Sequence, residues 1–285
     1  MIRRNRMPNA KDLAEAGPSS FMLVGPGGSG KTSQLWTLPQ PGFLYIFDPK
    51  ALDSLGGLNV DYETFSPDII SLDAIPLKSS KADKAMASRV MKVREPTAWI
   101  EWEEHFDDAV SQGFFNQYKW IGVDSTTTML DAIMEYVQFL NGRQGKHPEQ
   151  ADYTAQINTF RNVMRALSGL AETLVVLCHE EIYKDEHSGR VTYQPLLTGR
   201  LRTRLPLLFS NIFRLEVDQE KDGTAFWNIH TTGDRQHQYI RTSVKGLAPI
   251  LDGTIDDWDH PEKFGLGKII ANETSRITSK KGKEK

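Results

Sequence analysis

Short runs of apolar, β-prone residues alternate along the chain with amphipathic or polar stretches. Runs of this length are typical of buried parallel strands when helical patterns separate them. The clearest runs are Phe21 to Val24, Phe43 to Phe47, Trp120 to Val123 and Thr173 to Cys178. The alternation predicts an α/β fold with a mainly parallel central sheet flanked by helices.

Helical periodicity marks several of the intervening stretches. In the most regular of them, apolar residues recur at three- and four-residue steps from Ile157 to Leu170. This spacing places them on one face of a helix, where they can pack against the sheet. The pattern predicts helices over Pro96 to Gly113, Thr128 to Leu140 and Tyr153 to Leu170.

The pattern changes after Cys178, where strand-like runs are shorter and turn sequences separate them. Turn signals occur at Lys221 to Gly223 and at Gly233-Asp234. They predict an antiparallel extension of the sheet edge. Its strands would be Asn211 to Val217, Ala225 to Thr231 and Gln238 to Ser243.

These elements suggest one main domain. We expect an N-terminal extension over residues 1–20, a core over 21–250 and a C-terminal appendage over 251–274. The last segment, 275–285, is charged and polar, so we expect a disordered tail there.

Composition narrows the class of protein only slightly. The 285 residues carry a formal net charge of -3, which excludes a broadly basic surface, so any contact with nucleic acid must come from local clusters of Lys and Arg. The single cysteine, Cys178, excludes an intramolecular disulfide and fits a reducing compartment. No apolar stretch approaches the roughly 20 residues that span a bilayer. We therefore expect a cytoplasmic protein without membrane contact.

The strongest motif follows the first apolar run directly. Residues 25–32 fit the pattern G-x-x-x-x-G-K-[ST], and a helix is expected through Gln34, Leu35 and Trp36. Glycines let backbone N–H groups turn toward phosphate oxygens, and Lys31 would reach the β and γ phosphates. The motif predicts a site for ATP with Mg²⁺, formed by Gly25, Pro26, Gly27, Gly28, Ser29, Gly30, Lys31, Thr32 and Ser33.

The magnesium shell also needs a carboxylate from a neighbouring strand. The apolar run Trp120 to Val123 ends in Asp124, the position that phosphate-loop folds use for this acid. Thr32 would place its hydroxyl on the same ion. Alternatively, Asp124 could cap the helix that begins near Ser125, a role compatible with metal binding.

Hydrolysis further requires a group that orients water against the γ-phosphate. Asp48 ends the strand Phe43 to Phe47 at the edge where open α/β sheets bind ligands. The fourth run ends similarly in His179 and Glu180, and His179 could sense the γ-phosphate. A polar residue that merely closes a strand is the alternative for His179.

The order of these elements resembles the RecA-like ATPase core. More narrowly, it looks like the compact phage proteins of the Sak-four group, which are ATPases of single-strand DNA annealing and recombination. The resemblance covers about Phe21 to Leu247 and is carried by the Asp124-Ser125 and His179-Glu180 strand ends, with Pro195 to Gly199 followed by Leu205-Pro206. It implies three partners: single-stranded DNA, further copies of the chain and a single-strand-binding protein.

The sequence departs from this family at the catalytic glutamate. Lys50 stands two residues after the strand-ending Asp48, where RecA-like proteins carry that glutamate. Either Asp48 or Glu180 substitutes for it, or hydrolysis is slow.

Two polar loops occupy the positions of the DNA-binding loops in RecA-like proteins. The first contains Arg143 and Lys146, and the second ends in the basic cluster Arg200, Arg202 and Arg204. Basic loops suit a phosphate backbone, although each could equally be a solvated surface connection. Candidates that could reach the ATP of a neighbouring subunit are Arg241 and Lys245, for which a surface role is the alternative.

These observations lead to an ATPase that acts on single-stranded DNA in phage recombination or annealing. A P-loop ATPase that drives protein assembly or remodelling without DNA is the second hypothesis, and the acidic pI favours it slightly. A small-molecule kinase is the third. It would use an arginine-rich lid such as Arg200 to Arg204. The strands predicted after Cys178 are not expected in a kinase of that class.

Overall fold

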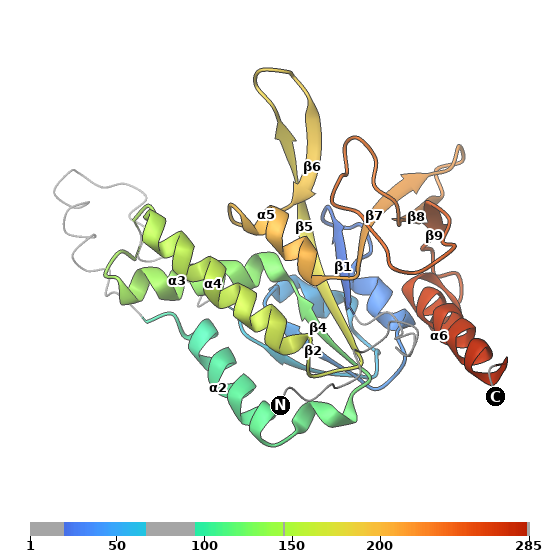
Figure 1. Ribbon diagram of the computed structural model, residues 1–285, viewed down its shortest axis with the longest axis horizontal. Helices are drawn as coiled ribbons and strands as arrows, with labels where there is room; N and C mark the ends of the chain where they lie inside the picture. Colours follow the sequence, from blue (N-terminus) through green and yellow to red (C-terminus); the bar gives the residue numbers. More distant parts are fainter. Residues whose placement is uncertain (1–19, 67–94, 145, 284–285) are drawn as a thin grey trace, which may run out of the picture.

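The structure is a computed structural model that describes residues 20–66, 95–144 and 146–283. In this part of the chain, a nine-stranded sheet runs in the order β3-β2-β4-β5-β1-β7-β8-β9, with β6 paired to β5 beside that path (Figure 1). Its strands are β1 (Ser20–Gly25), β2 (Gly42–Ile46), β3 (Val60–Thr64), β4 (Trp120–Asp124), β5 (Thr173–Lys184), β6 (Val191–Pro195), β7 (Asn211–Gln219), β8 (Ala225–His230) and β9 (Ile250–Asp252).

Helices cover both faces of the sheet. One face packs against α2 (Thr97–Ser111), α3 (Thr126–Leu140) and α4 (Gln150–Leu167). The other packs against the 3₁₀ helices η2 (Thr32–Thr37) and η3 (Pro49–Ser54) and against α6 (Gly265–Lys283). Shorter helices are η5 (Phe114–Gln117), α5 (Leu201–Arg204), η6 (Leu205–Leu208) and η7 (Pro261–Lys263). No helix in the described ranges is long and apolar enough to cross a membrane.

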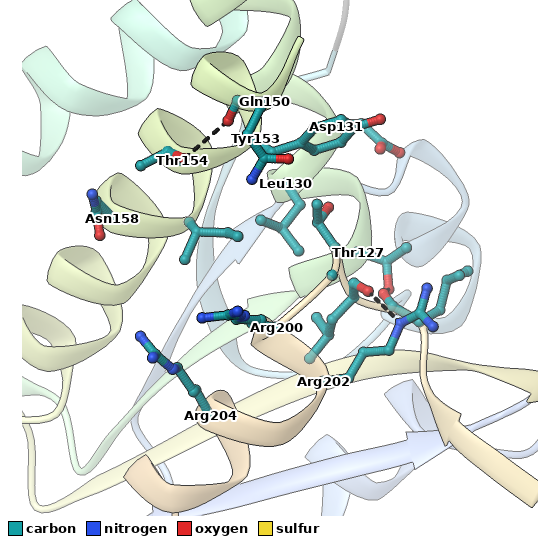
Figure 2. Close-up of a pocket in the computed structure, with 15 residues that line it drawn as sticks. Thr127, Leu130, Asp131, Gln150, Tyr153, Thr154, Asn158, Arg200, Arg202 and Arg204 are labelled. Atoms are coloured by element: carbon teal, nitrogen blue, oxygen red, sulfur yellow. Dashed lines mark hydrogen bonds between the residues drawn. The ribbon is translucent and has the colours of Figure 1, made fainter. Parts of the chain in front are cut away.

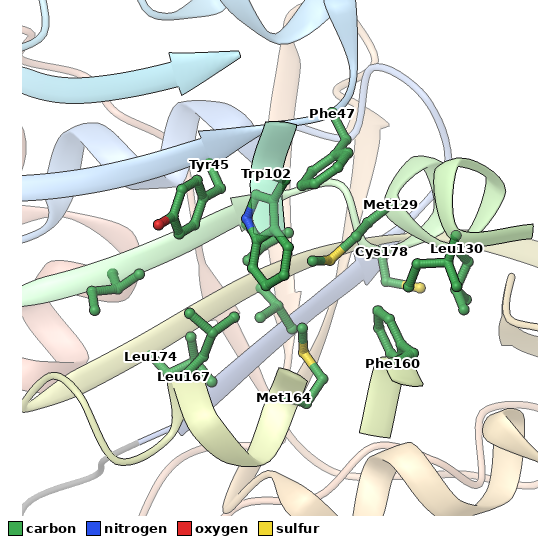
Figure 3. Close-up of a cluster of buried hydrophobic side chains, with 14 of the residues drawn as sticks. Tyr45, Phe47, Trp102, Met129, Leu130, Phe160, Met164, Leu167, Leu174 and Cys178 are labelled. Atoms are coloured by element: carbon green, nitrogen blue, oxygen red, sulfur yellow. The ribbon is translucent and has the colours of Figure 1, made fainter. Parts of the chain in front are cut away.

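This layering explains why the strands read as continuous apolar runs. Successive residues of a strand point to opposite faces, and here both faces are buried. Along β1, Met22 and Val24 join the core under α2 to α4, whereas Phe21 and Leu23 join the core on the other side. Figure 3 shows the first core, where Trp102 of α2 and helix residues such as Phe160 lie against the strands.

The strand register brings four chain segments to one edge of the sheet. In parallel pairing, Gly25 of β1 lies opposite His179 of β5, and Asp124 of β4 lies opposite Leu177. Ile46, at the end of β2, lies opposite Asp124. The carboxyl ends of β1, β2, β4 and β5 therefore meet, which is where open α/β sheets bind their ligands.

The expected fold class and the principal strands and helices are confirmed. The helix after the phosphate loop is a 3₁₀ helix, η2. The strand expected over Gln238 to Ser243 is wrong, because this segment pairs with the sheet only through a bridge between Ile212 and Arg241. From Arg214 onward, β8 already occupies that edge of β7 and leaves no room for a longer pairing.

Three strands carry too little apolar sequence to be recognised in advance. The residues of β3 after Val60 are exposed, those of β6 before Pro195 are half-buried, and β9 is three residues long. Their pairing comes from backbone hydrogen bonds to neighbours that the core already holds in place. In addition, β7 pairs parallel with β1, so the antiparallel extension begins only at β8.

The C-terminal segment is part of the core, contrary to its expected role as an appendage. Leu266 and Ile269 of α6 are buried against η2 and the sheet, and β9 pairs with β8. Helix α6 then continues to Lys283, into the segment expected to be disordered. Packing of its first turns supplies the helix nucleus that polar composition does not reveal. The expected extension over residues 1–20 lies outside the described residues except for Ser20, which begins β1.

Gln34 joins this C-terminal segment to the phosphate-loop helix. Its Nε2 donates to the Gly253 carbonyl at 2.8 Å, and its Oε1 accepts from the Leu266 backbone N–H at 2.9 Å. Gln34 is buried, and Gly267 passes so close to η2 that an added Cβ would lie 1.8 Å from the Thr37 carbonyl oxygen. The close approach and the amide bonds together fix α6 on η2.

We expect Gln34→Ala to lower the free energy of unfolding by about 3 kcal/mol, because it leaves a buried backbone N–H and a buried carbonyl without partners. Urea unfolding followed by circular dichroism measures the change. The control is Gln117→Ala at an exposed glutamine, for which a change within about 0.5 kcal/mol is expected. Equal effects of the two substitutions would contradict the bridging role of Gln34.

Candidate nucleotide site

The phosphate loop runs from the end of β1 to the start of η2. Gly28 and Gly30 have φ angles of 76° and 82°, in the left-handed region that glycine adopts without cost. At Gly30 an added Cβ would also lie 2.8 Å from Cδ1 of Trp227 on β8. Trp227 therefore supports the loop from one side, a contact that the sequence pattern does not reveal.

Lys31 is held inside the loop. Its Nζ donates to the carbonyl oxygens of Gly25 at 2.9 Å and Pro26 at 2.8 Å, and the side chain is buried. Burial lowers the pKa of Lys31, while the nearby carboxylate of Asp124 opposes that shift. The loop thus holds a desolvated cation beside the acids of the sheet edge, as phosphate binding requires.

Thr32 and Asp124 are brought together by the fold. The Thr32 hydroxyl donates to Oδ2 of Asp124 at 2.8 Å. Asp124 is buried, and desolvation raises its pKa to about 6 despite this hydrogen bond. The alternative role of Asp124 as a helix cap is wrong, because the Ser125 side chain caps α3 by accepting from the Thr128 N–H.

The donor set of Thr32 and Asp124 fits magnesium. Hydroxyl and carboxylate oxygens are hard ligands of the kind that Mg²⁺ uses together with substrate phosphates and water. Within the described residues, no group of three or more His, Cys, Asp or Glu side chains could hold a metal by itself. These two residues would therefore hold the ion only as part of a nucleotide complex.

Asp48 and His179 face each other across the same edge. Nε2 of His179 lies 3.5 Å from Oδ2 of Asp48, whose Oδ1 accepts from the Lys50 N–H at 3.0 Å. Burial and the charge of Lys31 lower the pKa of His179. The imidazole is therefore neutral at neutral pH and can accept or donate a hydrogen bond beside the phosphate loop.

Glu180, expected as a catalytic acid, is committed elsewhere. Its carboxylate accepts from Nε of Arg214 at 2.9 Å and from the Tyr239 hydroxyl at 2.6 Å, and the side chain is only 4% exposed. Arg214 also pairs with Glu216. Glu180 is therefore an ion-pair partner within β5 and β7 and is not free to orient water, because a buried arginine on β7 requires its charge.

Thr127 connects this edge to the loop before α5. Its hydroxyl accepts from the His179 N–H and donates to the Leu196 carbonyl, both at 3.2 Å. The Leu196 N–H in turn donates to the His179 carbonyl at 2.8 Å. Sequence reasoning missed this residue, although the run Thr126-Thr127-Thr128 after an acidic strand end was a visible signal.

Residues of the first basic loop mainly form contacts within the protein. The Arg143 guanidinium pairs with the fully buried Asp152 and with Glu149. The Lys146 backbone carbonyl accepts from Gln138 Nε2 at 2.8 Å, while the residue itself is exposed. Of the two expected contacts in this loop, Lys146 has the more accessible side chain.

The second basic cluster lines a cavity of about 810 Å³ between α3, α4 and α5. Figure 2 shows Arg200 and Arg204 reaching toward α4, whereas Arg202 points the other way. Nε of Arg202 lies 2.9 Å from the Leu197 carbonyl oxygen and 3.0 Å from Oε1 of Glu181. All three arginines line the cavity, and Arg202 also holds the loop in place through these two contacts.

The two residues expected to act on a neighbouring subunit have different surroundings in the structure. Arg241 donates from its guanidinium to the Phe209 carbonyl and so holds its own chain together. Lys245 lies on an exposed turn. The structure thus gives Arg241 an internal role and leaves Lys245 accessible.

Comparison with known proteins agrees with this architecture. A family model described as an AAA domain, AAA_24, matches residues 18–245. The chain belongs to this family. It has the fold of an AAA-type P-loop ATPase, and the phosphate loop, Asp124 and His179 all lie within the matched segment. No curated protein matches the chain.

Solved structures give weaker likenesses. The flagellar accessory protein FlaH from Methanocaldococcus jannaschii aligns at 10% identity and a TM-score of 0.37, over 85% of this chain and 87% of that one. The RadB recombinase aligns at 12% identity and a TM-score of 0.35, over 78% of this chain and 84% of that one. At these TM-scores the likenesses carry no argument about function.

The raised pKa of Asp124 makes stability depend on pH. Between about pH 4 and pH 6 the folded state holds this proton more tightly than the unfolded state, so stability falls as pH rises through that window. A shift from 3.8 to about 6 corresponds to about 3 kcal/mol. We expect Asp124→Asn, which carries no titrating proton, to remove this part of the pH dependence.

Urea unfolding between pH 4 and pH 7, without nucleotide and with a chelator of divalent ions, measures the effect. Wild type is expected to lose stability relative to Asp124→Asn as pH rises. A difference between the two proteins that stays constant over this range would contradict a raised pKa at Asp124.

Proposed function

We propose that the chain binds ATP with Mg²⁺ and couples its hydrolysis to contact with single-stranded DNA, as in phage recombination or annealing. The observation that carries the proposal is the Thr127 hydroxyl, which bonds both the His179 N–H and the Leu196 carbonyl. This one side chain joins the edge that would face the γ-phosphate to the loop that presents Arg200 and Arg204.

The nucleotide end of the proposal rests on the phosphate loop. Lys31 would bind the β and γ phosphates, and Thr32 with Asp124 would hold Mg²⁺. Asp48 and His179 are then the groups available to orient water, because Arg214 and Tyr239 occupy Glu180. Asp48 lacks a neighbouring glutamate, since Lys50 stands at that position, so basal hydrolysis should be slow.

The DNA end rests on Arg200 and Arg204. In the described part of the chain, neither guanidinium has a hydrogen bond or ion pair, and both border the cavity. Free guanidinium groups at a concave surface suit a phosphate backbone, and they supply the local positive charge that an acidic chain needs for nucleic acid. Lys146 can add a further phosphate contact.

Assembly belongs to the same proposal. The sequence resemblance implies further copies of the chain, and Lys245 is the accessible candidate for reaching the ATP of a neighbouring copy. A single-strand-binding protein is a proposed partner on the strength of the sequence resemblance alone.

Salt dependence of strand binding tests the DNA end directly. We expect Arg200→Ala with Arg204→Ala to weaken binding of a fluorescent single-stranded oligonucleotide. The slope of log K against log salt should become shallower by about 0.7 for each phosphate that the variant no longer neutralises. Fluorescence anisotropy over a salt series, with ATP and Mg²⁺ present, measures both quantities.

The matched control is Arg165→Ala, at an exposed arginine of α4 that does not line the cavity, and its slope should equal that of wild type. If wild type binds ATP but no oligonucleotide at low salt, the proposal fails and an ATPase that remodels proteins becomes the better account. If the double variant keeps the wild-type slope, these arginines do not bind the strand.

A further inference from the structure

The cavity beside α5 has two chemically different ends. Arg200 and Arg204 form a cationic wall at α5, and they reach toward α4 (Figure 2). Tyr153 of α4, Asp131 of α3 and Gln150 line the opposite end (Figure 2). A ligand that fills the cavity must therefore present an anion to one end and a flat or hydrogen-bonding group to the other.

Part of the cavity wall is apolar. Leu130, Ile157 and Leu197 line it, and Leu130 and Leu197 are buried core residues. These apolar side chains offer no hydrogen bond or charge to a chain of phosphates. At about 810 Å³, the volume lies in the range of roughly 300 to 1,000 Å³ that small-molecule sites occupy.

Charge fixes the orientation of such a ligand. The Asp131 carboxylate repels a phosphate from the Tyr153 end, and the arginine wall attracts it at the other end. Tyr153 is half-buried, so part of the residue is accessible. Aromatic rings in this setting stack on nucleobases of any sequence.

We propose that this cavity holds one unstacked nucleotide of the bound strand, with its phosphate on Arg200 and Arg204 and its base on Tyr153. The inference rests on the proposed function. It adds that the part of the strand bound in this cavity is a single nucleotide. It differs from a purely electrostatic groove, because an electrostatic groove binds the backbone and ignores the bases.

The cavity also reaches the coupling residue. Thr127 lines the cavity, and its hydroxyl holds the His179 N–H and the Leu196 carbonyl. A nucleotide in the cavity therefore touches the side chain that connects it to the nucleotide-hydrolysing edge. A groove confined to the protein surface would lack this contact.

Two strands of equal length and charge test the proposal, one with normal bases and one in which every base is replaced by an abasic site. Wild type should bind the normal strand about 5- to 100-fold more tightly than the abasic strand, as base stacking on an aromatic ring predicts. Tyr153→Leu should remove most of this preference and leave affinity for the abasic strand unchanged. Tyr153→Phe, which keeps the ring, should retain the preference.

The outcomes separate the inference from the proposed function. If wild type binds neither strand, the proposed function fails and the inference falls with it. If wild type binds both strands equally, or if Tyr153→Leu keeps the preference, the strand binds but the base pocket is wrong. Equally weakened binding of both strands by Tyr153→Leu, with an unfolding midpoint below that of Tyr153→Phe, assigns Tyr153 to packing and also overturns the inference.

Discussion

The site depends on the burial of a lysine and an aspartate at the carboxyl edge of a parallel sheet. Lys31 and Asp124 are both nearly inaccessible to solvent. Desolvation lowers the pKa of Lys31 and raises the pKa of Asp124, and so favours the neutral form of each. Each charge opposes the shift of the other, and the phosphate-loop carbonyls and the Thr32 hydroxyl add further bonds. Burying such a pair costs free energy. That cost is expected at a site that binds a charged ligand.

The pattern of the sequence predicted this edge well because its determinants are local. Apolar runs with both faces buried mark the parallel strands, and a phosphate loop or a polar residue follows each run where parallel strands end together. Neither feature depends on distant contacts. Lys31, Thr32 and Asp124 could therefore be placed from residue order alone.

What the sequence could not reveal is which charged residues are already paired. Arg143, Arg241 and Glu180 look like functional charges, yet partners elsewhere along the chain or across the sheet hold each of them. The same limit applies to α6, whose order comes from packing against elements that are distant in sequence. Pairing through the fold decides these cases, and a linear pattern does not record it.

Thr127 joins the nucleotide edge of the molecule to the arginine-bearing loop. Nucleotide-dependent movement of His179 would reach the Leu196 loop through a hydroxyl that contacts both, and strand contact would travel back along the same bonds. Under the proposed function, ATP hydrolysis and strand binding are linked through this hydroxyl and through the backbone bond from the Leu196 N–H to the His179 carbonyl, and are not two independent activities.

The most direct test is the ratio of ATP hydrolysis rates with and without a long single-stranded oligonucleotide, measured for wild type, Lys31→Ala and Thr127→Val. We predict a several-fold ratio for wild type, no hydrolysis by Lys31→Ala, and a ratio close to one for Thr127→Val, with Thr127→Ser restoring it. A Thr127→Val protein that the strand stimulates as strongly as wild type would contradict the coupling through Thr127.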